Sequence, residues 1–323
     1  MMALVIILFF TGFVLITKGA DIFIDCTVLI GKKTGISEII LGATIVSFAT
    51  TLPELTVSTL ASIDNHTTMS LGNAVGSIIC NTGLILGLVA FISPFKVDKG
   101  MFSSKSIILL ISVLALMILG RDGSITRKDG LLLIILLAVY MYTNVKSVSG
   151  NSKNSSNSND GMNSFRATSN KFENLKTALL FILGLVMMVV GSKLLVDNGV
   201  KLASFIGIPQ GVISLTVIAL GTSLPELVSS LTAIRKKHHG ISVGNILGAN
   251  ILNITSVIAI SSLINDLPIL AQNIKIDFLF MIGLLLLLIL PTMKKSKLYR
   301  IQGFLMLGTY IIYITTLYFM YLA

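Results

Sequence analysis

The stretch GATIVSFATTLPELTVS at residues 42–58 recurs in the second half of the chain as LTVIALGTSLPELVSS at residues 215–230. The two stretches belong to a longer match, because residues 35–81 align without a gap with residues 207–253 at a constant offset of 172. Of these 47 aligned pairs, 17 are identical. The sequence therefore contains an internal repeat, and the repeat guides the interpretation of every other segment.

The composition indicates a membrane protein. Of the 323 residues, 54% are hydrophobic and only 12% are charged, whereas a soluble domain carries about 25% charged residues. So few charges cannot cover a water-exposed surface, which argues against a soluble enzyme, a secreted domain and a disordered chain. The two cysteines, Cys26 and Cys80, lie in apolar stretches and provide neither a disulfide framework nor a CxxC metal site. We expect no cofactor.

Apolar segments of about 20 residues predict transmembrane helices. The fold class that we expect is therefore an all-α polytopic membrane protein with about ten transmembrane helices, of which the first and sixth are long enough to be tilted. The expected limits are 2–30, 37–62, 70–92, 104–120, 129–146, 174–204, 209–234, 242–264, 275–293 and 299–322.

An Asn/Ser-rich segment at residues 148–173 separates the fifth and sixth expected helices. Its polarity and low complexity predict a flexible linker. The linker divides the chain into a first five-helix repeat at 1–147 and a second at 174–323. Since five is an odd number, the second repeat is expected to enter the membrane inverted, as in many secondary transporters with a substrate site at mid-membrane.

Lysine and arginine residues set the expected orientation. In the ten-helix arrangement, 17 of them, Lys105 included, fall on the side that holds the linker, against six on the opposite side. Cytoplasmic loops carry this excess, so the linker is expected in the cytoplasm and both termini outside. The predicted location is the plasma membrane, with multiple passes through the bilayer.

Glu54 and Glu226 occupy equivalent positions near the middle of the second and seventh expected helices. An ionised side chain at that depth costs at least about 2.5–3.5 kcal/mol, and neither helix offers a nearby lysine or arginine. A mobile cation is the simplest counter-charge. Pro53 and Pro225, which lack an N–H group, are expected to free carbonyl oxygens beside the two carboxylates. The expected carbonyls are those near Ser47, Ala49, Thr50, Ala219, Gly221 and Thr222.

Neutral oxygens surround the two glutamates in the sequence. All donors are oxygen, which suits hard ions such as Na⁺ and Ca²⁺ rather than Zn²⁺ or Cu⁺. Two carboxylates balance one Ca²⁺ or two Na⁺, so competition between these ions is expected. The hydroxyl and amide groups come from Ser47, Thr50, Thr51, Ser77, Asn81, Thr222, Ser223 and Asn253.

Other polar and small residues have simpler interpretations. Glycines spaced by four are expected to let helices approach closely, and they are Gly72, Gly76, Gly244 and Gly248. Three histidines are expected to be solvated in loops, namely His66, His238 and His239. Asp25 and Asp197 match under the same offset, and an interfacial or capping role is expected for both.

The two repeats resemble a known family. Together with SLGNAVGSIICN at 70–81 and SVGNILGANILN at 242–253, the opening stretches are similar to the two alpha-repeats of the calcium/cation antiporter superfamily. Within it, the chain most resembles the prokaryotic sodium/calcium exchangers. The resemblance implies exchange of Na⁺ for Ca²⁺ across the lipid bilayer by alternating access, with the ions as substrates. It implies no enzymatic activity, no nucleic acid and no obligate protein partner.

The resemblance also implies a ligand set. Ca²⁺ would be held by the carboxylates of Glu54 and Glu226 and the carbonyls of Thr50 and Thr222. The Na⁺ positions would be completed by oxygens of Ser47, Thr51, Ser77, Asn81, Ala219 and Ser223.

Two residues depart from the family pattern. Ala249 stands where the family often has serine, which removes one hydroxyl ligand, and Asn253 stands where some members carry aspartate. The missing carboxylate leads us to expect transport independent of K⁺. Two alternatives stay open at this point. The same glutamates could load protons in an antiporter of H⁺ and Ca²⁺ or another divalent cation, and a passive cation channel would not need matched halves.

Overall fold

A computed structural model describes residues 2–154, 171–205 and 219–322, and helices dominate these segments. The long apolar runs form helices that are uninterrupted over most of their length. They are α1 (Met2–Thr34), α7 (Lys99–Leu119), α8 (Arg127–Asn154), α9 (Lys171–Phe205), α15 (Phe278–Lys295) and α16 (Arg300–Leu322). Leu4, Ile7 and Phe10 of α1 are each about 60% exposed, as expected of side chains that face lipid.

The segments of the internal repeat, and those that follow them directly, are instead broken into short pieces. In the first half these are α2 (Glu38–Leu41), η1 (Gly42–Val46), α3 (Ser47–Thr50), α4 (Leu52–Ile63), α5 (Thr67–Cys80), η2 (Asn81–Leu86) and α6 (Gly87–Ile92). In the second half they are α11 (Ala219–Thr222), α12 (Leu224–Arg235), α13 (His239–Leu252), η6 (Asn253–Ile258), α14 (Ala259–Ile264) and η7 (Asn273–Asp277). The four η elements named here are π-helical turns, which often mark functional sites within longer helices.

The connections contain a 3₁₀ turn, η3 (Gly120–Asp122), and four two-residue strands: β1 (Phe95–Lys96), β2 (Ser124–Ile125), β3 (Leu267–Pro268) and β4 (Lys297–Leu298). Strand β1 pairs antiparallel with β4, and β2 with β3, so that each pair joins one strand from either half of the chain. The two halves are therefore tied to one another at their connecting loops as well as through their helices.

The offset of 172 residues that aligns the two sequences also aligns the bounds of the elements. It relates α3 to α11, α4 to α12, α5 to α13, η2 to η6, α6 to α14 and β1 to β3, with both ends of each pair in register. The positive backbone φ angles follow the same rule, since Asn65 at 62° corresponds to Lys237 at 65°. The repeat is therefore a property of the backbone and not only of the residue types.

Most of the expected helices have counterparts in the structure. Within the described residues, eight helices are long and apolar enough to cross a membrane, and the pair Glu38–Thr50 and Leu52–Ile63, bent by 42°, makes a ninth. The expected helix at 209–234 is described only from Ala219, and residues 206–218 lie outside the described part. Helices α8 and α9 each enter the segment expected as a linker, of which residues 155–170 lie outside the described part.

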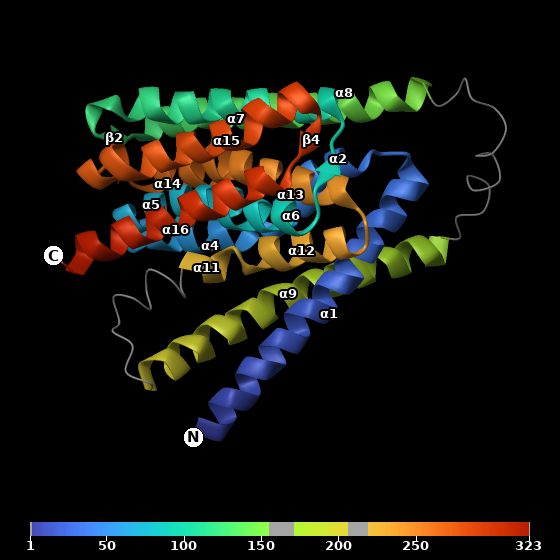
Figure 1. The fold of residues 1–323 in the computed structure, drawn as a ribbon, viewed down its shortest axis with the longest axis horizontal. Coiled ribbons are helices and arrows are strands. Elements are labelled where there is room, and N and C mark those ends of the chain that lie inside the picture. The colour runs from blue at the N-terminus through green and yellow to red at the C-terminus, as the bar shows by residue number, and fades with distance from the viewer. Residues whose placement is uncertain (1, 155–170, 206–218, 323) are drawn as a thin grey trace.

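Helices α1 and α9 form a pair that runs obliquely to the other helices (Figure 1). Their backbones meet at glycines. A Cβ atom on Gly12 would lie 2.8 Å from the Gly191 carbonyl oxygen, and one on Gly19 would lie 2.8 Å from that of Gly184. Small residues at such crossings allow membrane helices to approach closely and gain van der Waals contact. The two longest helices therefore pack chiefly against each other.

The repeat segments form the buried centre of the bundle, beside the α1–α9 pair. Every residue of α13 from Ile241 to Leu252 is buried. Gly244 fits against the first half of the chain, because a Cβ there would lie 2.2 Å from the Ile39 carbonyl oxygen. The expected close packing is thus observed for Gly244 and Gly248, whereas it is wrong for Gly72 and Gly76, where an added Cβ would meet no atom within 4 Å. The central helices are also where polar side chains are buried in number.

Candidate ion-binding site

Glu54 and Glu226 lie in the first turns of α4 and α12, just after the helix breaks at Thr51 and Ser223. Proline follows each break at the second helical position, where its missing N–H group costs no hydrogen bond. The first turn of a helix favours negative charge, because free N–H groups point toward it. The sequence predicts a local break in the helix next to each proline, and the structure puts a carboxylate directly after each break.

The two carboxyl groups are close enough to interact electrostatically, and both side chains are 0% exposed. Glu54 also meets the second half of the chain through Ser223. The Ser223 hydroxyl oxygen lies 3.4 Å from Glu54 Oε1 and 3.4 Å from the hydroxyl oxygen of Ser77. Side chains from α4, α5 and the α11–α12 break thus converge on one buried point.

The Glu226 carboxyl group makes the equivalent approach to the first half. It lies beside the hydroxyl groups of Thr50 and Thr51, on the break between α3 and α4. Neither of its oxygens forms a hydrogen bond of good geometry, and the Thr51 hydroxyl has no partner either. Each glutamate therefore faces the helix break of the opposite repeat, and Glu226 has acceptor capacity that protein groups leave unused.

Two asparagines that sequence reasoning did not assign to the site connect the repeats. Asn73 accepts a hydrogen bond of 3.3 Å from Thr222, and Asn245 accepts one of 3.1 Å from Thr50. Asn73 also donates to Ser58 at 2.9 Å. The signal was available in the sequence, because Asn73 and Asn245 correspond under the offset of 172. Their hydrogen bonds join the two halves of the chain, so these contacts can be identified only in the folded structure.

The two asparagines that were expected as ligands differ in their surroundings. Asn81 donates to Asn250 at 3.1 Å, Asn250 in turn donates to Thr82 at 2.9 Å, and Asn81 Oδ1 has no partner. Asn253 is buried with neither of its polar atoms paired. The amide oxygens of Asn81 and Asn253 are thus both free to bind a cation.

The remaining expected ligands occupy a tight part of the same region. Ser47 is fully buried and donates to the Thr44 carbonyl at 3.2 Å. Its own carbonyl accepts from the Thr51 N–H at 2.9 Å, so the expectation that the proline break frees this carbonyl is wrong. The reason is that the helix continues through Thr50 and breaks one residue later. Ala219 is the first residue of α11.

Unpaired buried polar atoms concentrate on the expected ligands. Among the described residues, seven of the fifteen such side-chain atoms belong to Thr51, Glu54, Asn81, Glu226 and Asn253. Leaving a polar group buried without a partner costs about 1–3 kcal/mol, and more for a charged group. Within the described segments, neither glutamate has a salt bridge and no three His, Cys, Asp or Glu side chains cluster as for a transition metal. A bound hard cation would satisfy the six oxygens among these seven atoms, but not the amide nitrogen of Asn253.

The expectation of solvated histidines is only partly correct. His66 is exposed, but His238 Nδ1 lies 2.6 Å from Glu38 Oε1 and His239 contacts Ser93 and the ring of Phe95. These contacts attach the start of α13 to neighbouring loops. They arise because positive φ at Lys237 turns the chain back toward the start of α2.

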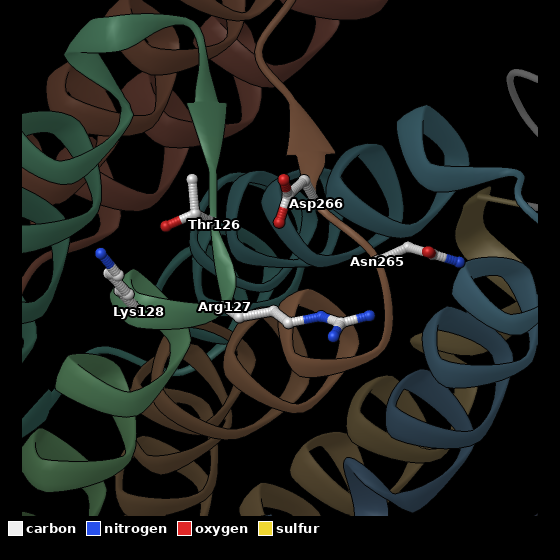
Figure 2. A pocket seen from close by; sticks show the side chains of 5 residues that line it. All are labelled: Thr126, Arg127, Lys128, Asn265 and Asp266. Carbon is white, nitrogen blue, oxygen red and sulfur yellow. The ribbon is translucent and has the colours of Figure 1, made fainter.

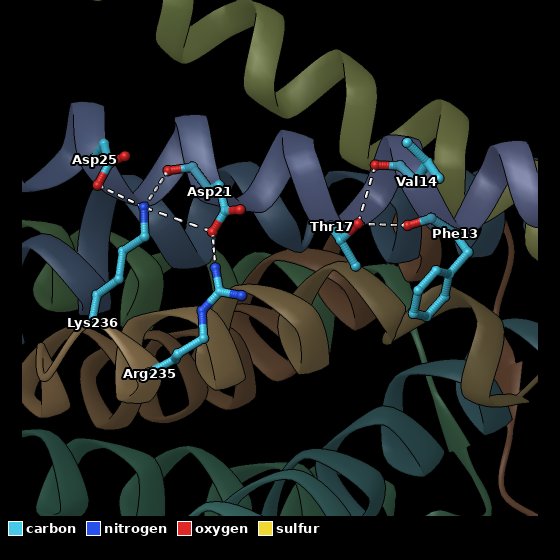
Figure 3. A network of polar contacts seen from close by, with 7 residues as sticks. All are labelled: Phe13, Val14, Thr17, Asp21, Asp25, Arg235 and Lys236. Atoms are coloured by element: carbon cyan, nitrogen blue, oxygen red, sulfur yellow. Dashed lines mark hydrogen bonds and ion pairs between the residues drawn. The ribbon is translucent and has the colours of Figure 1, made fainter.

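The basic loop after α12 is paired with α1. Arg235 bonds to Asp21, and Lys236 Nζ lies 2.7 Å from Asp25 Oδ1 (Figure 3). Asp25 thus forms an exposed ion pair, and its expected interfacial position stays a prediction. The Asp25 side chain is 64% exposed, so this network lies at the surface and away from the buried glutamates.

A surface hollow of about 420 Å³ lies next to strands β2 and β3, lined by polar side chains that include Arg127 and Asp266 (Figure 2). None of the expected ligands lines it. The glutamates, at 0% exposure, are closed to both surfaces of the molecule in this conformation.

Comparison with known proteins identifies the family. A family model described as "Sodium/calcium exchanger protein" matches residues 4–146 and 176–319. The chain belongs to the sodium/calcium exchanger family. It is a membrane transporter rather than an enzyme, and exchangers of this family use no cofactor. The resemblance inferred from the repeat motifs is confirmed.

Relatives of this exchanger cover nearly its whole length. An uncharacterised membrane protein of Methanocaldococcus jannaschii, MJ0091, is 37% identical over 309 residues, which are 96% of either chain. The sodium/calcium exchanger MaX1 of Methanosarcina acetivorans is 28% identical over 95% of this chain and 97% of its own. The structure of the sodium-calcium exchanger NCX_Mj soaked with Na⁺ without Ca²⁺ matches with a TM-score of 0.84 and 35% identity, covering 98% of this chain and 100% of that one.

Proposed function

We propose that this exchanger is a secondary active antiporter that moves Ca²⁺ in one direction and Na⁺ in the other, through a mid-membrane site formed by Glu54 and Glu226. The observation that carries the proposal is the buried pair itself. Two carboxyl groups from equivalent positions face each other's repeat without a positively charged partner among the described side chains. Either one Ca²⁺ or two Na⁺ would neutralise the pair, so that the two loads are mutually exclusive.

The donor set supports hard cations. Around the glutamates lie the hydroxyl oxygens of Ser223, Thr50 and Thr51, and within the described segments no three His, Cys, Asp or Glu side chains form a metal-binding cluster. Ca²⁺ takes six to eight oxygen ligands in flexible geometry, which carboxylates, hydroxyls and carbonyls together can supply. We assign Ca²⁺ to the two carboxylates with the carbonyls of Thr50 and Thr222. The Na⁺ positions would draw on Ser47, Thr51, Ser77, Asn81, Ala219, Ser223 and Asn253.

Alternating access would follow from the repeat. If the five-helix halves at 1–147 and 174–323 are inverted in the membrane, they provide two nearly equivalent conformations that open to opposite sides. The closed glutamates described above would then belong to an occluded state between them. In this arrangement both termini lie outside, and the segment 148–173 is a cytoplasmic linker.

The experiment that tests the proposal measures Ca²⁺ flux into proteoliposomes, driven separately by a Na⁺ gradient and by a pH gradient. We expect flux that follows the Na⁺ gradient and persists when the pH gradient is collapsed. Uncoupled current without a counter-ion would instead indicate a passive channel.

One residue favours a second candidate, the antiport of H⁺ for Ca²⁺ or another divalent cation. Ala249 is fully buried in α13 and offers no hydroxyl where the family often has serine, which weakens a Na⁺ position but not proton loading of the glutamates. Flux that follows only the pH gradient would support this second candidate and reject the first.

A further inference from the structure

A buried lysine lies outside the candidate site. Lys105 of α7 is 1% exposed, although the count of basic residues assigns it to the cytoplasmic face. It donates to the Asn144 side chain, and its Nζ lies 5.4 Å from the centre of the Tyr140 ring. Within the described segments it has no carboxylate partner. Burying a charged group in a membrane segment costs free energy. The position of Lys105 therefore needs a physical reason other than its contribution to the orientation of the protein in the membrane.

Lys105 is connected to the candidate site through Tyr140, a fully buried side chain of α8. The Tyr140 hydroxyl donates to the Ala43 carbonyl and lies beside the Ser47 side chain. Ala43 belongs to the π-helical turn η1, where the hydrogen-bond register of the helix changes and carbonyl groups need outside donors. Tyr140 supplies such a donor to the Ala43 carbonyl. Ala43 lies four residues before Ser47, which is an expected Na⁺ ligand.

Ser47 is held from the other side by α13. A Cβ atom on Gly248 would lie 2.5 Å from the Ser47 hydroxyl oxygen and 2.8 Å from the Ala43 carbonyl oxygen. The turn that carries Ser47 is therefore fixed between the Tyr140 hydroxyl and the α13 backbone.

The second half of the chain provides an internal comparison. Tyr313 is 13 residues after the start of α16, as Tyr140 is 13 residues after the start of α8. Tyr313 donates to Asp277 at 3.0 Å, and Asp277 corresponds to Lys105 under the offset of 172. The Asp277 carboxylate accepts a hydrogen bond from the Tyr313 hydroxyl. The Lys105 ammonium group has no acceptor atom and cannot accept one from the Tyr140 hydroxyl. The two tyrosines therefore bond to different partners, the Ala43 carbonyl for Tyr140 and the Asp277 carboxylate for Tyr313.

From these contacts we infer that Tyr140 is a positioning residue for the Na⁺ side of the ion site, and that Lys105 keeps the Tyr140 hydroxyl directed at the Ala43 carbonyl. The inference rests on the proposed function, because it assigns Ser47 to Na⁺ binding. It distinguishes the ions: Tyr140 acts on Na⁺ through Ser47, whereas Ca²⁺ depends mainly on the two glutamates.

The test compares Tyr140→Phe with Tyr313→Phe, which removes the matched hydroxyl from the other half. Both full-length variants are reconstituted, and Ca²⁺ flux is titrated with Na⁺ and with Ca²⁺. Since one hydrogen bond is worth about 0.5–1.5 kcal/mol, Tyr140→Phe is expected to raise the half-saturating Na⁺ concentration about two- to tenfold. The KM for Ca²⁺ should change less than twofold, and Tyr313→Phe should change neither value. Equal Na⁺ affinity in the two variants, or equal shifts for both ions, would overturn the inference.

A second measurement decides the matter without relying on Na⁺ coupling. Hydrogen exchange of the amides in residues 42–50 is expected to be faster in Tyr140→Phe and in Lys105→Asp than in the wild type. It should be unchanged in Tyr313→Phe. If Na⁺ drives no flux, the proposed function fails, while unchanged exchange in Tyr140→Phe would reject the positioning role alone.

Discussion

Replacing Gly248 with alanine is expected to impair cation binding, because the new methyl group would enter the space that Ser47 occupies. The added Cβ would lie 2.5 Å from the Ser47 hydroxyl oxygen and 2.8 Å from both the Cα and the carbonyl oxygen of Ala43. Ordinary van der Waals contact begins near 3.4 Å. Two of the three contacts involve backbone, which cannot turn aside as a flexible side chain can.

The magnitude follows from this overlap. Forcing an extra methyl group into a packed interior costs typically about 1–3 kcal/mol. The protein can relieve this overlap by displacing Ser47. If the whole cost then destabilises only the ion-bound state, the apparent affinity for the cation that Ser47 binds decreases by roughly 5- to 150-fold. We expect the Na⁺ dependence of Ca²⁺ flux to report this change, with the glutamates still in place.

The assay uses purified protein in proteoliposomes, with Na⁺ varied at fixed Ca²⁺. Gly308→Ala is the matched control, because a Cβ on Gly308 in α16 would meet no atom within 4 Å. That variant should behave as the wild type and gain some helix stability. Wild-type Na⁺ dependence in Gly248→Ala would show that the contact between α13 and η1 does not position the site.

Further predictions concern the departures from the family pattern and the surface ion pairs. Ala249→Ser restores a buried hydroxyl and should lower the half-saturating Na⁺ concentration in the flux assay; an unchanged value would mean that position 249 does not face Na⁺. Because Asn253 carries no charge, Ca²⁺ uptake into vesicles should not depend on K⁺, and K⁺-dependent uptake would contradict this. Asp25→Asn should change flux less than twofold, because its exposed pair with Lys236 is worth at most about 1 kcal/mol; a large loss would give this pair a mechanical role.

The helices and the centre of the site could be anticipated because their physical signals are local. Long apolar runs set the spans, and proline next to a glutamate set the breaks at Thr51 and Ser223. The internal repeat supported the other expectations, because each motif occurs twice and its two copies can be compared. The Ser47 carbonyl was expected to be free but is bonded to the Thr51 N–H, because a proline affects mainly the carbonyls that its own missing N–H and ring would meet.

Contacts between helices could not be anticipated in the same way. Tyr140 reaches Ala43 across 97 residues of chain, and nothing in the sequence around Tyr140 indicates which helix it faces. Lys105 was interpreted from its charge alone, whereas its burial depends on Asn144 and Tyr140 of the neighbouring helix. Asn73 and Asn245 could have been assigned to the site from their match in the repeat, but their partners could not.

Glu54 and Glu226 are proposed to hold the transported cation, and direct Ca²⁺ binding to the purified protein tests this role. Isothermal titration of the wild type, Glu54→Gln and Glu226→Gln with Ca²⁺ should be run on protein that elutes as a single folded species. We predict binding to the wild type that Na⁺ competes away, and no binding to either glutamine variant. Wild-type Ca²⁺ affinity in both variants would contradict it.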